Sequence, residues 1–180
     1  MDITAILKSV ESSGLAAWIR DSLYAFPLIE SFHVVGLTMV FGTIAIIDLR
    51  LLGLSWTYRP FTKITRDIVK WTWFAFALTV TTGLLMFITN AGVYFNNFQF
   101  RSKMVLIALS GLNMLVFELT AGRVVHRWDT DKAAPPAGRL AGALSLVLWI
   151  SIIFLGRWIG FTTTGHATPD TEINLDDLFK

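Results

Sequence analysis

Three histidines are the most informative side chains of this 180-residue sequence, because cysteine is absent. Without cysteine the chain has no disulfide, no thiolate metal site and no covalent c-type haem attachment. His33 lies within a long apolar stretch, His166 follows the last such stretch, and His126 lies in a basic connection. Neutral imidazole is an axial ligand of b-type haem, which needs no covalent attachment. We therefore expect His33 to be an axial haem ligand or metal ligand, with His166 as the second ligand if the tail folds back.

Basic side chains are predicted at the depth of His33, on the side of the molecule that holds both termini (side A). Arg157, Lys103 and Arg101 would be placed there to pair with haem propionates. Glu30 precedes His33 by one helical turn and could orient its ring. The alternative is a cofactor-free polar network, in which Glu30, His33, Lys103 and Arg157 tie helices together.

Other candidate sites are weaker. On the opposite side (side B) the sequence predicts structural ion pairs within a second charged group: Asp48, Arg50, Glu118, Arg123 and Arg139. A zinc or copper site built from His33, His166, Glu30 and Asp170 lacks the close ligand spacing of such sites. Recognisable nucleophile elbows and phosphate loops are absent, which argues against a self-contained hydrolase.

The amino-acid composition indicates the class of protein to which these residues belong. It is 54% hydrophobic and 16% charged, whereas soluble domains carry roughly 25% charged residues. The net charge of +2 is too small to indicate a nucleic-acid partner. The sequence therefore predicts an integral membrane protein.

Four apolar stretches are long enough to cross a bilayer: about 29–52, 71–93, 104–121 and 140–161. Each must be a helix, because the hydrocarbon core offers peptide groups no other partner. We expect an all-α, up-down four-transmembrane-helix bundle over residues 27–162. Residues 1–26 are predicted as an interfacial amphipathic helix broken near Ser12-Ser13-Gly14, and 163–180 as a polar extramembrane tail.

The basic residues predict the orientation. Nine lie on side B and six on side A, and the positive-inside rule places the more basic side in the cytoplasm. We therefore expect a multi-pass protein of the bacterial inner membrane with both termini in the periplasm.

Several spaced motifs carry a resemblance that covers about residues 20–162. They are FPLIESFHVVGL at 26–37, DLRLLG at 48–53, TGLL at 82–85, FRSK at 100–103, Asn113 and GRW at 156–158. With these motifs the chain resembles a family of small, largely uncharacterised bacterial four-helix membrane proteins. More distantly it resembles the membrane part of copper-resistance D proteins and cytochrome b561-like bundles, whose helical histidines imply haem or metal binding. Only His33 matches such a position, and the histidine pairs of two-haem bundles are absent.

The sequence thus favours a membrane b-type cytochrome-like protein or subunit with one haem b near the periplasmic face. It would transfer electrons between a quinone or periplasmic redox partner and another protein, and is more an electron-transfer protein than an enzyme. The alternatives are a cofactor-free anchor or assembly subunit of a larger membrane complex, and a copper- or metal-handling protein. A homo-oligomer is compatible with each of these.

Overall fold

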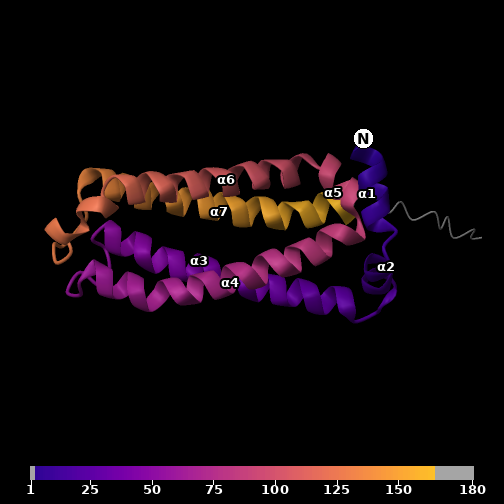
Figure 1. Cartoon of the computed structure of the whole chain (residues 1–180), viewed down its shortest axis with the longest axis horizontal. Coiled ribbons are helices and arrows are strands. Elements are labelled where there is room, and N and C mark those ends of the chain that lie inside the picture. The colour runs from indigo at the N-terminus through magenta and orange to yellow at the C-terminus, as the bar shows by residue number, and fades with distance from the viewer. Residues whose placement is uncertain (1–2, 165–180) are drawn as a thin grey trace, which may run out of the picture.

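The computed structural model of the chain describes residues 3–164 and contains no strand in that part. Four long helices run lengthwise with alternating direction (Figure 1): α3 (Ala25–Leu51), α4 (Phe61–Thr89), α6 (Phe98–Leu119) and α7 (Pro136–Thr164). At about 1.5 Å per residue, even α6 is long enough to cross a hydrocarbon core of about 30 Å. All four are also apolar enough to do so. The predicted all-α four-helix bundle of a multi-pass membrane protein is confirmed.

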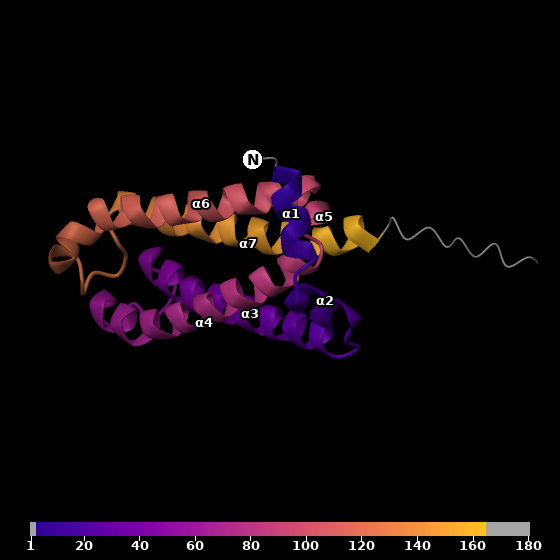
Figure 2. The ribbon, with the colours of Figure 1, turned by 45° about the vertical axis from the view of Figure 1, so that its right-hand side comes forward.

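The bundle consists of two helical hairpins. α3 packs along α4, α6 packs along α7, and α3 with α7 joins the two pairs, while α4 and α6 meet through aromatic ring contacts near their ends, Phe61–Phe117 and Phe87–Phe100. Turning the molecule shows the α6–α7 pair separated from α4 along much of its length (Figure 2). Between the hairpins, the side chains of Val40, Ala75, Trp149 and Ile152 form a buried apolar cluster.

Side A of the bundle is covered by three short helices: α1 (Ile3–Glu11), α2 (Gly14–Asp21) and α5 (Ala91–Asn96). α1 and α2 lie across the end of the bundle (Figure 1). The predicted break between them is confirmed, and the Ser13 side chain caps α2 by accepting a hydrogen bond from the Ala16 N–H. Arg20 donates to the Thr89 carbonyl at the end of α4 (3.0 Å), and Glu11 accepts from the Gly92 N–H (2.8 Å). These two bonds attach the N-terminal helices to the bundle.

Side B is closed by the 52–60 connection and by the segment 120–135, which includes the 3₁₀-helix η1 (Gly122–Arg127). A small buried cluster lies beneath them, made of Leu51, Phe61, Ala121, Trp128 and Ala134. The Trp128 indole N–H donates to the Ala121 carbonyl at 3.0 Å. The connections of side B are therefore packed onto the helix ends.

α4 begins at Phe61, ten residues before the apolar stretch predicted from hydropathy. Hydropathy identifies only the part of a helix that lies in hydrocarbon, whereas the first turns of α4 carry charged side chains outside it. The Asp129 carboxylate caps these turns, because it accepts from the Thr62 N–H (2.7 Å) and from the Thr62 hydroxyl (2.9 Å).

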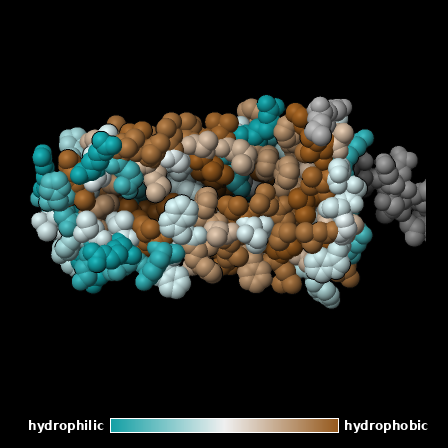
Figure 3. Space-filling view, in the orientation of Figure 1, coloured by the Kyte–Doolittle hydropathy of each residue, from teal (hydrophilic) through white to brown (hydrophobic). Residues whose placement is uncertain are grey.

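The distribution of apolar and hydrophilic residues over the surface agrees with four membrane-spanning helices. Apolar residues cover the length of the bundle and hydrophilic residues gather most densely at side B (Figure 3). Large apolar side chains such as Phe74, Leu112 and Phe154 are more than half exposed, which a water-soluble monomer would avoid and a lipid-facing helix requires.

Candidate functional site

His33 is held against α4 by its ring. Its Nδ1 lies 3.0 Å from the Thr79 carbonyl oxygen and 3.1 Å from the Thr82 hydroxyl oxygen. A carbonyl only accepts hydrogen bonds, so this contact requires the proton on Nδ1. In the neutral imidazole, Nε2 then keeps its lone pair, which is the arrangement found in histidines that bind a metal through Nε2.

Small residues allow the ring and the two helices to approach. A Cβ built on Gly83 would lie 3.1 Å from the His33 Cε1, so the imidazole rests over this glycine. A Cβ on Gly36 would lie 2.6 Å from the Thr79 hydroxyl oxygen. The close contact of α3 and α4 at this level therefore depends on both glycines.

Lys103 faces this region from the other hairpin. Its half-buried side chain extends across Gly156 of α7, where a built Cβ would be 3.4 Å from the Lys103 Nζ. This contact places the ammonium against α7. Among residues 3–164 it has no hydrogen-bond or ion-pair partner, although a cation within a membrane helix normally has one.

The residues around His33 and Lys103 lie at a common depth. We measured depth as the number of residues from the side A end of each helix. His33 lies eight residues from the end of its helix, Thr82 seven, Lys103 five and Gly156 eight. At 1.5 Å per residue these positions lie about 8–12 Å from the helix ends. We call His33, Thr79, Thr82, Gly83 and Lys103 the side A site.

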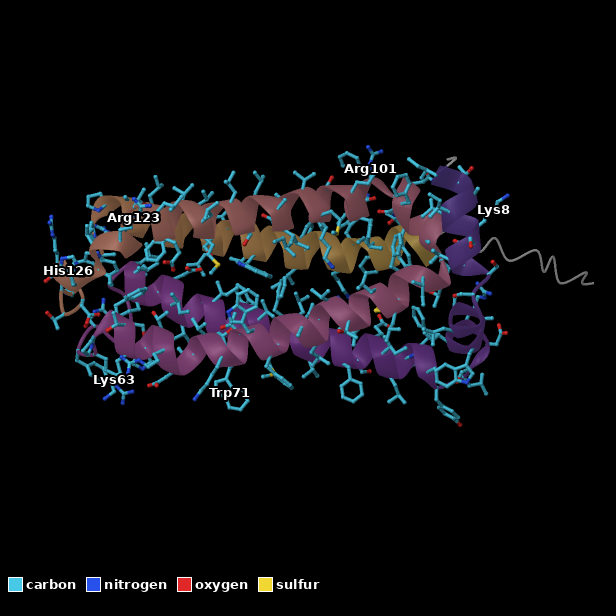
Figure 4. The ribbon with its side chains drawn as sticks, in the orientation of Figure 1. Lys8, Lys63, Trp71, Arg101, Arg123 and His126 are labelled. Atoms are coloured by element: carbon cyan, nitrogen blue, oxygen red, sulfur yellow. The ribbon has the colours of Figure 1, made fainter. Side chains whose placement is uncertain are left out.

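The other side A candidates lie around this site rather than in it. Arg101 is exposed and points away from the bundle (Figure 4). Arg157 is also exposed, and its guanidinium carbon lies 6.0 Å from the centre of the Phe161 ring. Glu30 is exposed and acts on Tyr94 of α5, whose pKa is raised by burial and by the Glu30 carboxylate. The structure therefore leaves Arg101 and Arg157 on the surface, whereas the half-buried Lys103 side chain lies against α7 at a similar depth to His33. His166 lies outside the described residues.

On side B the expected ion pairs are not formed among the described residues, where the recorded ion pair joins Arg20 to Asp21. Arg50 is completely buried and donates instead to the backbone carbonyls of two connections: those of Arg59, Asp129, Asp131 and Lys132, at 2.9–3.4 Å. Asp48 is 5% exposed, and its Oδ2 atom has no partner in the described part of the chain. The expectation was wrong because it considered only charged partners, whereas the nearby loops offer carbonyls.

His126 lies in the last turn of η1, exposed at the far end of side B (Figure 4). It is thus separated from His33 by most of the bundle length. No group of three His, Asp or Glu side chains within residues 3–164 could hold a metal ion. Of the residues of the metal-site alternative, His33 and Glu30 lie within the described region, and His166 and Asp170 lie outside it.

Sequence reasoning did not identify Thr79 as part of the site. Thr79, Thr82 and Gly83 follow the i, i+3, i+4 spacing that places residues on one helix face. A face of two hydroxyls and a glycine in an otherwise apolar helix is the signal that could have identified the surface opposite His33.

Comparison with known proteins identifies a family. Residues 11–162 match DUF6644, a family of unknown function. No curated protein and no solved structure matches the chain. A resemblance to copper-resistance D proteins or to cytochrome b561 is not shown.

Proposed function

Because the chain belongs to the DUF6644 family, whose function is unknown, we propose a function from its own residues. It is a membrane b-type cytochrome-like protein or subunit that holds one haem at the side A site and transfers electrons. The observation that carries this proposal is the hydrogen bond from His33 Nδ1 to the Thr79 carbonyl, at 3.0 Å. It fixes the ring and leaves Nε2 available for iron.

Lys103 supports the same assignment. Its ammonium lies at the level of His33 and has no anionic partner within the described residues. A haem propionate is an anion of the right kind for such a cation at the membrane boundary. Arg157 and Arg101 belong to the same side A end and would act on a propionate only from the surface.

The chain's own residues would each have a defined task. Thr79 and Thr82 hold the tautomer of His33, Gly83 gives the ring room, and Lys103 neutralises a carboxylate. His166 remains the proposed second axial ligand. A bound b-type haem supplies one-electron transfer, with a potential set by its axial ligands and its burial.

The orientation is part of the proposal. The excess of basic residues on side B supports a cytoplasmic side B, which places the side A site near the periplasmic face of a bacterial inner membrane. A quinone or a periplasmic redox protein would then exchange electrons at side A.

Haem content of purified variants tests this function. We expect His33→Ala to lose haem, and His126→Ala to keep it, because His126 is exposed at the opposite end. Lys103→Gln should keep haem at reduced occupancy. A His33→Ala protein with the full haem content of the unaltered chain would refute the proposal.

A second candidate is a cofactor-free anchor or assembly subunit of a larger membrane complex. It is favoured by α6, in which Ser110 is the only buried residue among those described. α6 packs along α7 and contacts α4 through Phe100 and Phe117, but its exposed apolar side chains, such as Leu112 and Leu115, are available to other subunits. Colourless protein from haem-rich cells, with equal stability of His33→Leu, would favour this candidate. A metal-handling role keeps only the pair His33 and His166.

A further inference from the structure

A groove opens on side B between the first half of α4 and the end of α6 with η1. It has a volume of about 610 Å³, which is within the size range of ligand-binding pockets. It lies beside the ring contact of Phe61 (α4) with Phe117 (α6), whose centroids are 6.1 Å apart and which both line it.

The walls of this side B groove are chemically divided. α4 contributes two cations, Arg66 and Lys70, and α6 contributes one acid, Glu118. The apolar part is lined by Val69, Trp73 and Phe117, among others. The groove therefore combines a net positive patch with an apolar surface.

The division coincides with the membrane boundary. Lys70 is the last charged residue before the run from Trp71 to Phe100, which contains no Asp, Glu, Lys or Arg. One turn farther along α4, Trp73 still lines the groove. The basic part of the groove thus lies at headgroup level, and the apolar part reaches into the hydrocarbon.

We propose that this groove binds an anionic phospholipid. Its phosphate lies between Arg66 and Lys70, and an acyl chain follows Val69 and Trp73 of α4 towards the bilayer centre. Basic pockets between membrane helices bind anionic lipid headgroups by this combination of charge and apolar surface.

Other occupants fit the charges less well. A neutral quinone ring would leave the net positive charge of the groove without a counter-charge. A second copy of the chain that docked through this face would bring four basic groups against two acids. This proposal does not depend on haem binding, because the groove and the side A site lie at opposite ends of the bundle.

Native mass spectrometry of the full chain in a mild non-ionic detergent tests the proposal. Phosphatidylglycerol and phosphatidylcholine are titrated separately, and the affinity for the first bound lipid is measured. Each basic side chain near an anionic lipid contributes about fivefold in affinity. We therefore expect Arg66→Gln/Lys70→Gln to bind phosphatidylglycerol about 30-fold more weakly than the unaltered chain.

The matched control removes two charges from the same end without touching the groove. Arg59 and Lys63 are exposed and do not line it, so Arg59→Gln/Lys63→Gln should stay within about twofold of the unaltered chain. Glu118→Gln removes the acid and should strengthen binding by up to about fivefold. That gain keeps the test decisive if the double variant fails to fold.

Five results would overturn the proposal. They are equal affinity for the two lipids, unchanged phosphatidylglycerol binding in Arg66→Gln/Lys70→Gln, or weaker binding in Glu118→Gln. The fourth is a quinone that stays bound to the purified protein, or a dimer of the chain. Either would overturn the proposal if it is lost in Arg66→Gln/Lys70→Gln and is not displaced from the unaltered chain by added phosphatidylglycerol. Glycerol 3-phosphate that competes as well as the lipid would likewise show a site for the headgroup alone.

Discussion

Replacing Arg50 tests how side B is held together. Its guanidinium is 0% exposed and donates to four backbone carbonyls in the 52–60 and 120–135 segments. The Asp129 carbonyl also accepts from the Phe61 N–H, at 2.9 Å, so it remains bonded without Arg50. The carbonyls of Arg59, Asp131 and Lys132 take their donor from Arg50.

The expected loss follows from these three carbonyls. An unsatisfied buried group costs roughly 1–3 kcal/mol. Residues 59, 131 and 132 are exposed, so water reaches their carbonyls in part and the lower bound applies to each. We expect Arg50→Met to lower the free energy of unfolding by about 3 kcal/mol, and Arg50→Lys by about half as much, because an ammonium cannot reach both connections.

The assay is unfolding by dodecyl sulfate in mixed micelles, followed by near-ultraviolet circular dichroism, to which the buried Trp128 contributes. Arg139→Met is the control, since Arg139 is exposed at the same end and its loss should cost less than about 0.5 kcal/mol. An Arg50→Met protein within about 1 kcal/mol of the unaltered chain would refute the account of Arg50 as the link between the two connections.

Three more predictions concern single positions, and the same unfolding assay measures each. Gly36→Ala should cost about 1–3 kcal/mol, because its Cβ would lie 2.6 Å from the Thr79 hydroxyl; Gly42→Ala, with nothing within 4 Å of its Cβ, should be neutral or stabilising, and equal effects would contradict the close helix approach. Asp129→Ala should cost about 1–2 kcal/mol through loss of the α4 cap, and an unchanged midpoint would remove that role. Asp48→Asn should not destabilise the protein, because the Oδ2 atom that it replaces has no partner in the described part of the chain; a loss above about 2 kcal/mol would reveal one.

The sequence was sufficient for the four membrane helices because long, predominantly apolar runs directly reflect burial in hydrocarbon. The break between α1 and α2 was also predictable, since Ser13 and Gly14 are favoured at a helix start. The start of α4 was not predictable from the sequence. It depends on Asp129, which lies 67 residues from the Thr62 that it caps, and no local pattern connects the two.

The candidate site was predictable in part. An ionisable residue within a span indicates function by default, and this selected His33 and Lys103. Their environment depends on how two hairpins pack and on the register of α3 against α4, which places Thr79 rather than an apolar residue beside the His33 ring. Arg157 and Lys103 have similar depth but face differently, because Arg157 lies on the outer face of α7. The depth of a residue in the membrane follows from its position in the sequence, whereas the direction in which its side chain points depends on how the helices pack.

The optical spectrum of the purified protein tests the central claim most directly. It should be recorded in detergent, as isolated and after dithionite reduction, from cells grown with ample haem. The account predicts a Soret band that sharpens on reduction, with resolved α and β bands, and their loss in His33→Ala but not in His126→Ala. A flat spectrum of the unaltered chain, or an unchanged spectrum of His33→Ala, would contradict it.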